Sequence, residues 1–279
     1  MSLLFALLLQ VGPFPGVDTM PRADDPLINR PPPRRLRGRN PVVEIEGISP
    51  SSQWLQNCLN QLEQDAARAH AMAQIRRTET KGADRVLANL CLGAASSALA
   101  RWDDARDAFL AAREGTPADE PRARARFAAM AGNAALEGRG SEEALALLGI
   151  AREDALAASD RTLEAIALTD SARALVALER AEQALAALQE ATRLAPERPG
   201  GWLLHATLLR RLDRLDEAQT AIERAAKLAP DDPEIALEAG VIAVLTGRDE
   251  AARASWQQVI ALDPASPLAE TARGYLAQL

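Results

Sequence analysis

The sequence has few of the residues on which catalysis, metal binding and base stacking depend. Its 279 residues include two histidines, two cysteines and one tyrosine, and aromatic residues make up 3%. His70 and His205 are far apart in the chain, and no C-x-x-C pair, G-x-S-x-G motif, Walker loop or G-x-G-x-x-G motif occurs. We therefore expect no enzyme active site, no metal, no cofactor and no small-molecule substrate.

Lysine is also scarce, because only Lys81 and Lys227 are lysines among the 32 basic residues. The formal net charge is −7. A net acidic chain is poorly suited to neutralising a phosphate backbone, so we expect no nucleic-acid partner. The abundance of Ala, Arg, Gly and Pro is typical of a GC-rich, bacterial genome.

Long apolar runs are absent, and a short one stands at the start. It extends from Leu3 to Leu9 and is followed by prolines and glycines. A membrane-spanning helix needs about 20 apolar residues, so we expect no transmembrane span. We predict that residues 1–20 are a signal-peptide-like segment and that the protein is periplasmic or secreted. A cytoplasmic protein is the alternative, because no basic residue precedes the run and no clear A-x-A site follows it.

Residues 21–50 are rich in proline and arginine, with "NRPPPRRLRGRNP" at their centre. Successive prolines favour polyproline II, and clustered arginines repel one another. We predict a disordered linker here. A basic arm that touches anionic lipid or an acidic partner is the alternative.

The apolar residues that are present are mostly Ala and Leu, which favour helices over strands. Three segments, "EATRLAPERP", "RAAKLAPDDP" and "QVIALDPASP", recur at intervals of 34 residues. When their first prolines are aligned, a helical stripe of small and large residues precedes each one. Its three positions hold Ala184, Ala218 and Ala252; Leu188, Ile222 and Trp256; and Ala191, Ala225 and Val259.

This pattern resembles the tetratricopeptide repeat, a 34-residue helix–turn–helix unit with the motif W-x2-L-G-x2-Y…A-x3-F…P. "LCLGAASSALARWDDARDAFLAAREGTP" matches the motif upstream, and further motif positions hold Gly132, Ala144, Leu148, Trp202 and Gly240. The resemblance implies an all-α protein: an α-solenoid, coiled as a right-handed superhelix, of about five to six units with a C-terminal cap helix. It covers residues 51–279, with units at about 51–81, 82–117, 120–158, 161–196, 197–230 and 231–264 and a cap helix at 266–279.

The recurring segments predict how each unit is built. Small residues let the two helices of a unit approach closely, and the large residue fills the space beside them. The first proline ends the second helix, and the second proline begins the next helix. The 40 residues between Ala144 and Ala184 indicate a longer second helix in the third unit, and Ser51 or Ser52 is expected to cap the first helix.

Cys58 and Cys91 are 33 residues apart, nearly one repeat, which places both on the first helices of adjacent units. We predict a disulfide between them, in keeping with an exported protein. Two buried free thiols are the alternative. His205, next to Trp202 on an expected first helix, is predicted to be a packed or rim residue.

In this family, bound peptides often lie in a groove lined by the first helix of each unit. The resemblance therefore implies a scaffold or adaptor that binds a protein or peptide partner. Arg173 and Arg210 are expected to hold a carboxylate or backbone carbonyl groups there, and ordinary solvated side chains are the alternative. The family's carboxylate clamp is absent, since its positions hold Leu90, Ala94, Met130 and Glu234. Alternatives are a structural module with weak self-association and a cytoplasmic adaptor. The expected groove residues are Asn133, Thr169, Asp170, Arg173, Leu203, Leu204, Thr207, Arg210, Leu237 and Val241.

Overall fold

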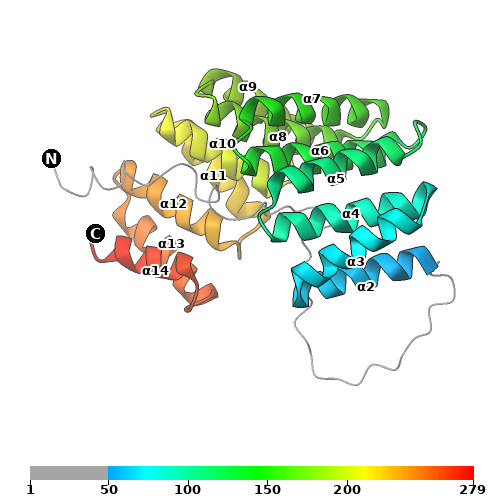
Figure 1. Cartoon of the computed structure of the whole chain (residues 1–279). Coiled ribbons are helices and arrows are strands. Elements are labelled where there is room, and N and C mark those ends of the chain that lie inside the picture. The colour runs from blue at the N-terminus through cyan, green and yellow to red at the C-terminus, as the bar shows by residue number, and fades with distance from the viewer. Residues whose placement is uncertain (1–49) are drawn as a thin grey trace. The chain divides into compact units, whose positions relative to one another are not determined.

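The computed structural model describes residues 50–279, which contain thirteen helices and no strand (Figure 1). The predictions for residues 1–20 and for the linker up to residue 49 lie outside this part. None of the described helices combines the length and the apolar character that crossing a membrane requires. The helices are α2 (Pro50–Gln64), α3 (Ala66–Glu79), α4 (Gly82–Ala98), α5 (Trp102–Gly115), α6 (Pro121–Glu137), α7 (Ser141–Ala157), α8 (Arg161–Ala177), α9 (Ala181–Leu194), α10 (Pro199–Arg211), α11 (Leu215–Leu228), α12 (Pro233–Leu245), α13 (Asp249–Leu262) and α14 (Pro267–Leu276).

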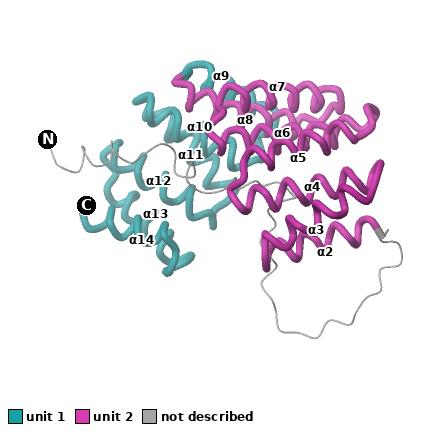
Figure 2. The backbone as a smooth tube through the Cα atoms, in the orientation of Figure 1, with its two compact units in different colours: residues 1–20, 180–279 teal, residues 21–179 magenta. Residues whose placement is uncertain are grey.

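The described chain divides into two compact units between Glu179 and Arg180 (Figure 2). Unit 2, named as in the figure, contains α2 to α8, and unit 1 contains α9 to α14. Within each unit, antiparallel helical hairpins pack one after another. The predicted all-α solenoid of helix–turn–helix repeats is thereby confirmed.

Prolines and capping side chains set the helix ends in the way that the recurring segments predict. Helix α9 ends two residues before Pro196, and Pro199 is the first residue of α10. A proline fits at this position because its missing N–H would have no partner inside the helix. The Asp232 side chain caps α12 by accepting a hydrogen bond of 2.9 Å from the backbone N–H of Glu234.

The longer second helix predicted for the third unit is confirmed. Helix α7 contains 17 residues, whereas α5, α9, α11 and α13 contain 14 each. The first helices of this region are long as well, because α6 and α8 also contain 17 residues. The extra turns account for the interval of 40 residues in place of 34.

Close packing of a glycine against a large side chain holds three hairpins together. A β-carbon added to the glycine would lie 2.4, 2.7 or 2.2 Å from the facing side chain, closer than such atoms approach in proteins. The small residue therefore sets how near the two helices come, and the large side chain fills the core. The three pairs are Gly93 with Phe109, Gly132 with Leu148, and Gly240 with Trp256.

The last helix, α14, covers the apolar end of unit 1. Ala269 and Ala272 are buried, and the Tyr275 ring lies 5.1 Å from the Trp256 ring between centroids. The opposite side of α14 carries exposed polar residues such as Glu270 and Arg273. This polar face is what a terminal helix of a repeat array needs in order to stay in water.

A disulfide joins the first helix of the described chain to the next hairpin. The Cys58 and Cys91 sulfur atoms are bonded, their Cα atoms lie 6.4 Å apart, and both side chains are fully buried. The bond links α2 to α4, the first helices of adjacent hairpins, as their spacing predicts. It closes a loop of the chain that contains all of α3.

Candidate functional site

Four of the side chains on α6 and α8 in unit 2 form one polar cluster, which we call the α6–α8 polar cluster: Asn133, Glu137, Asp170 and Arg173. The Asn133 amide donates to Asp170 Oδ2 at 2.9 Å. Arg173 donates to Glu137 Oε1 at 3.0 Å and to Asn133 Oδ1 at 3.4 Å. Three of the predicted groove residues, Asn133, Asp170 and Arg173, thus lie beside one another on the neighbouring first helices α6 and α8.

The arginine of this cluster is neutralised by the protein itself. Arg173 lies 3.0 Å from Glu137 and 3.8 Å from Asp170, and these three side chains are 14–15% exposed. One positive and two negative charges give the cluster a formal charge of −1. Arg173 is therefore no free cation for a ligand carboxylate, and any partner meets a mixed, mildly acidic surface.

Glu137 was missed by the sequence prediction, although it lies one helical turn after Asn133 and so on the same side of α6. Thr169 was predicted and lies on α8, half-buried. Its hydroxyl group donates to the Ala165 carbonyl at 2.8 Å, within its own helix. Thr169 therefore adds a small, locally satisfied polar group to the surface of α8.

In unit 1 the predicted arginine is part of a buried ion pair. Arg210 Nε on α10 donates to Glu238 Oε1 on α12 at 2.6 Å, and a second bond measures 3.3 Å. The two side chains are 9% and 2% exposed. The guanidinium and the carboxylate satisfy each other, so this pair joins the two first helices without a ligand.

Three other predicted residues of unit 1 lie beneath the surface. Thr207 is 1% exposed, and its hydroxyl donates to the Leu203 carbonyl at 3.0 Å. Leu237 and Val241 on α12 are 5% and 3% exposed and belong to the core around Trp256. They support the first-helix face from within, and a partner does not reach them in this arrangement.

Leu203 and Leu204 on α10 are the predicted residues of unit 1 that remain partly exposed. In unit 2, the positions of the family's carboxylate clamp carry the buried side chains of Leu90, Ala94 and Met130. The predicted residues that remain accessible are therefore the two leucines on α10 and four polar residues on α6 and α8: Asn133, Thr169, Asp170 and Arg173.

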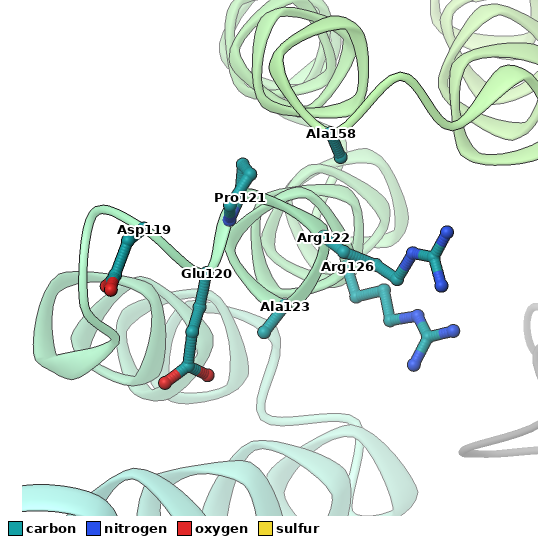
Figure 3. A pocket seen from close by; sticks show the side chains of 7 residues that line it. All are labelled: Asp119, Glu120, Pro121, Arg122, Ala123, Arg126 and Ala158. Atoms are coloured by element: carbon teal, nitrogen blue, oxygen red, sulfur yellow. The ribbon is translucent and has the colours of Figure 1, made fainter.

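A recess of about 390 Å³ opens at the start of α6 in unit 2 (Figure 3). Figure 3 shows that Asp119 and Glu120 extend to one side of the helix and Arg122 and Arg126 to another. Arg122 is held by Asp160, with 2.9 Å between Nε and Oδ2. Because the acidic and basic side chains lie on different sides of the helix, the recess has no patch of one charge that would attract a charged ligand. The recess is lined by Asp119, Glu120, Pro121, Arg122, Ala123, Arg126 and Ala158.

The pKa of each histidine is lowered, which favours the neutral imidazole. His70 on α3 is 7% exposed and lies 3.5 Å from an Arg101 nitrogen; burial, reinforced by Arg101, lowers its pKa below the ordinary value of 6.5. Burial likewise lowers the pKa of His205 on α10, opposed by Glu217. Neither histidine belongs to a group of three or more possible metal ligands within residues 50–279.

The comparisons with known proteins agree with this architecture. Residues 203–267, from α10 to the first residue of α14, match the family model described as tetratricopeptide repeat. Over these residues the resemblance found in the sequence is confirmed by the family model. No curated protein matches the sequence.

Solved tetratricopeptide-repeat structures share the fold. PilW, described as a widely conserved type IV pilus biogenesis factor, has a TM-score of 0.62 at 19% identity, with 79% of this chain and 97% of PilW covered. PilF of Pseudomonas aeruginosa has a TM-score of 0.60 at 17% identity, covering 80% and 96%. The repeat protein TTC0263 of Thermus thermophilus has a TM-score of 0.55 at 23% identity, covering 69% and 99%.

Proposed function

We propose that this protein is a non-catalytic scaffold that binds a segment of another protein along the faces of its first helices, in the bacterial cell envelope. The observation that carries the proposal is the α6–α8 polar cluster. Side chains from two neighbouring first helices hold one another in place there, so the surface is formed before any partner arrives. A preformed surface loses less conformational entropy on binding than a flexible one.

The chemistry of the accessible residues indicates what such a partner offers. On α6 and α8 it meets the Asn133 amide, the Asp170 carboxylate and Thr169, which suit backbone amides and hydroxyl or amino groups of an extended segment. On α10 it meets Leu203 and Leu204, which suit an apolar side chain. Arg173 and Arg210 act within the protein in this proposal, because Glu137 and Glu238 already bind them.

Location in the envelope is supported by two separate observations. The buried Cys58–Cys91 disulfide is of a kind that persists in oxidising compartments and is rare in the bacterial cytosol. The fold is shared with PilW, a type IV pilus biogenesis factor, and type IV pili are assembled in the envelope. An exported scaffold is consistent with both.

The proposal is tested by cross-linking in cells followed by affinity capture, with the wild type compared to surface variants. Thr169→Arg and Leu204→Glu alter partly exposed positions on first helices, and Glu153→Arg and Gln183→Glu are matched controls at exposed positions on second helices. Charge changes at Thr207 or Arg210 are unsuitable, because these side chains are buried and their replacement would disturb folding.

We expect one partner to be captured by the wild type and by the controls and lost from the folded first-helix variants. Capture by all variants alike would refute binding on these faces. Self-association is the competing explanation, and light scattering across a concentration series detects it. The exposed polar side of α14 opposes end-to-end stacking through that helix, so we expect a constant molecular mass.

A further inference from the structure

A half-buried histidine, His205, occupies a position in unit 1 where the repeat motif has leucine. In the W-x2-L-G stretch of α10, Trp202 provides the aromatic residue, and His205 stands at the leucine position before Ala206. Both ring nitrogens of His205 are buried and have no hydrogen-bond partner among residues 50–279. The ring lies 6.2 Å from the Trp202 ring between centroids. A polar group left unpaired at a packing position calls for a physical explanation.

Within the described part of the chain, the charged groups around this ring are bound to one another and offer it no acceptor. Arg214, the N-cap residue of α11, and Glu217 on α11 act on His205 with opposite signs, and they bind each other through two hydrogen bonds of 2.7 Å. On α9, Glu182 acts on Arg214. On α12, Glu238 is bound to Arg210. The carboxylate that would suit a protonated His205 is therefore already engaged.

We infer that His205 is an acid-sensitive element that opens the contact between α10 and α11 when its ring is protonated. The neutral ring is tolerated as an apolar surface beside Trp202. A second proton would place a full charge among apolar groups without a partner, which is strongly unfavourable. The charge is relieved when the two helices separate and water enters, or when Glu217 leaves Arg214 for the imidazolium.

The size of the effect has an upper limit set by the ordinary histidine pKa of 6.5 in the opened state. Between pH 7.5 and pH 5.0, one such group can raise the opening equilibrium constant by at most about 30-fold. The direction follows from linkage: the open state binds the proton more tightly than the closed state, so lower pH favours opening.

The inference has a consequence for binding that rests on the proposed function. Helix α10 also carries Leu203 and Leu204, so opening of the α10–α11 contact would disturb this part of the first-helix face. A partner bound there would be released in acid. The opening itself needs no partner, and it is measured separately.

Hydrogen exchange of the full chain, followed by mass spectrometry at pH 7.5 and pH 5.0, tests the inference. Exchange rates of peptides from α10 and α11 are corrected for the intrinsic effect of pH. The wild type is compared with His205→Leu, which restores the leucine of the motif, and with His205→Gln, which keeps a polar group that does not titrate. His70→Gln is the matched control, because the other histidine lies in unit 2.

We expect the opening constant of α10 and α11 to rise by several-fold and at most about 30-fold in the wild type and in His70→Gln. We expect no rise in either His205 variant. The inference is overturned if the wild type shows no rise, or if both His205 variants rise as much as the wild type does. These outcomes are independent of whether the proposed partner exists.

Discussion

Replacing Gly240 by alanine tests the close helix packing on which the repeats depend. An added β-carbon would lie 2.2 Å from Nε1 of Trp256 and within 2.7 Å of two further ring atoms. The indole is 1% exposed, and its N–H donates to the Leu237 carbonyl at 3.2 Å, so it cannot move aside into solvent. The helices α12 and α13 must separate, or the ring must leave its hydrogen bond.

The net effect follows from two opposing terms. Overpacking a well-filled core costs about 1–3 kcal/mol, and the rigid, bonded indole places this site at the upper end. Alanine in place of glycine in a helix returns about 1 kcal/mol. We therefore expect Gly240→Ala to lower the free energy of unfolding by about 2 kcal/mol.

Gly149→Ala is the matched control for this prediction. Gly149 is exposed in the middle of α7, and within the described chain no side chain beyond its two neighbours and no other helix lies within 4 Å of its added β-carbon. The control should gain about 0.5–1 kcal/mol of stability from helix propensity alone. Urea unfolding followed by far-ultraviolet circular dichroism measures both variants.

Opposite signs for the same substitution are the expected result. If Gly240→Ala is as stable as the wild type while Gly149→Ala is stabilised, the close contact between Gly240 and Trp256 is refuted. The double variant Gly240→Ala/Trp256→Leu provides a further check. It should be destabilised by less than the sum of its single variants, because the smaller side chain makes room for the methyl group.

Three further predictions concern the disulfide, the buried ion pair and pH. Removing the 33-residue cross-link with Cys58→Ala/Cys91→Ala should lower the free energy of unfolding by about 3 kcal/mol in urea titrations, and alkylation of two thiols in the unreduced, unfolded wild type would contradict the bond. Arg210→Met leaves Glu238 buried without a partner and should cost about 3–5 kcal/mol, most of it recovered in Arg210→Met/Glu238→Met; a loss below about 1 kcal/mol would show that the pair is not buried. Burial lowers the pKa of His70 and His205, so their contribution to the free energy of unfolding is complete above pH 6.5 and is lost as the pH falls below that value. A urea midpoint and slope that are the same at pH 7.5 and pH 5.0 would contradict this prediction.

The helical framework could be predicted from the sequence because it depends on spacing along the chain. The interval of 34 residues between Pro196, Pro230 and Pro264 reflects a unit of two helices, and each proline restricts the backbone in the same way wherever it occurs. The glycine at 240 and the tryptophan at 256 belong to the same hairpin. Their contact therefore follows from helical periodicity within one unit.

The ion-pair partners could not be predicted in this way. Glu137 and Arg173 are 36 residues apart, and Arg210 and Glu238 are 28 apart, so neither separation follows the repeat. Which carboxylate a long guanidinium side chain reaches depends on the distance between neighbouring helices. That distance is set by the packed side chains and not by sequence spacing.

The sequence also could not predict which of the expected groove residues are buried. Helical periodicity shows that Leu237 and Val241 lie on the same side of α12. How deeply these side chains are buried depends on the helices that pack against that side. The expected cap at Ser51 or Ser52 is wrong, because α2 begins at Pro50 and includes both serines. The Ser51 hydroxyl instead donates to Asp84 on α4, 33 residues away.

Site-specific photo-cross-linking in cells tests the central claim, binding on the first-helix faces, most directly. A photoreactive amino acid replaces Thr169 or Leu204 on first helices, or Glu153 or Gln183 on second helices, one position at a time. The account predicts that one protein is cross-linked from positions 169 and 204 and not from 153 and 183. Cross-links from the second helices alone, or from no position, would contradict it.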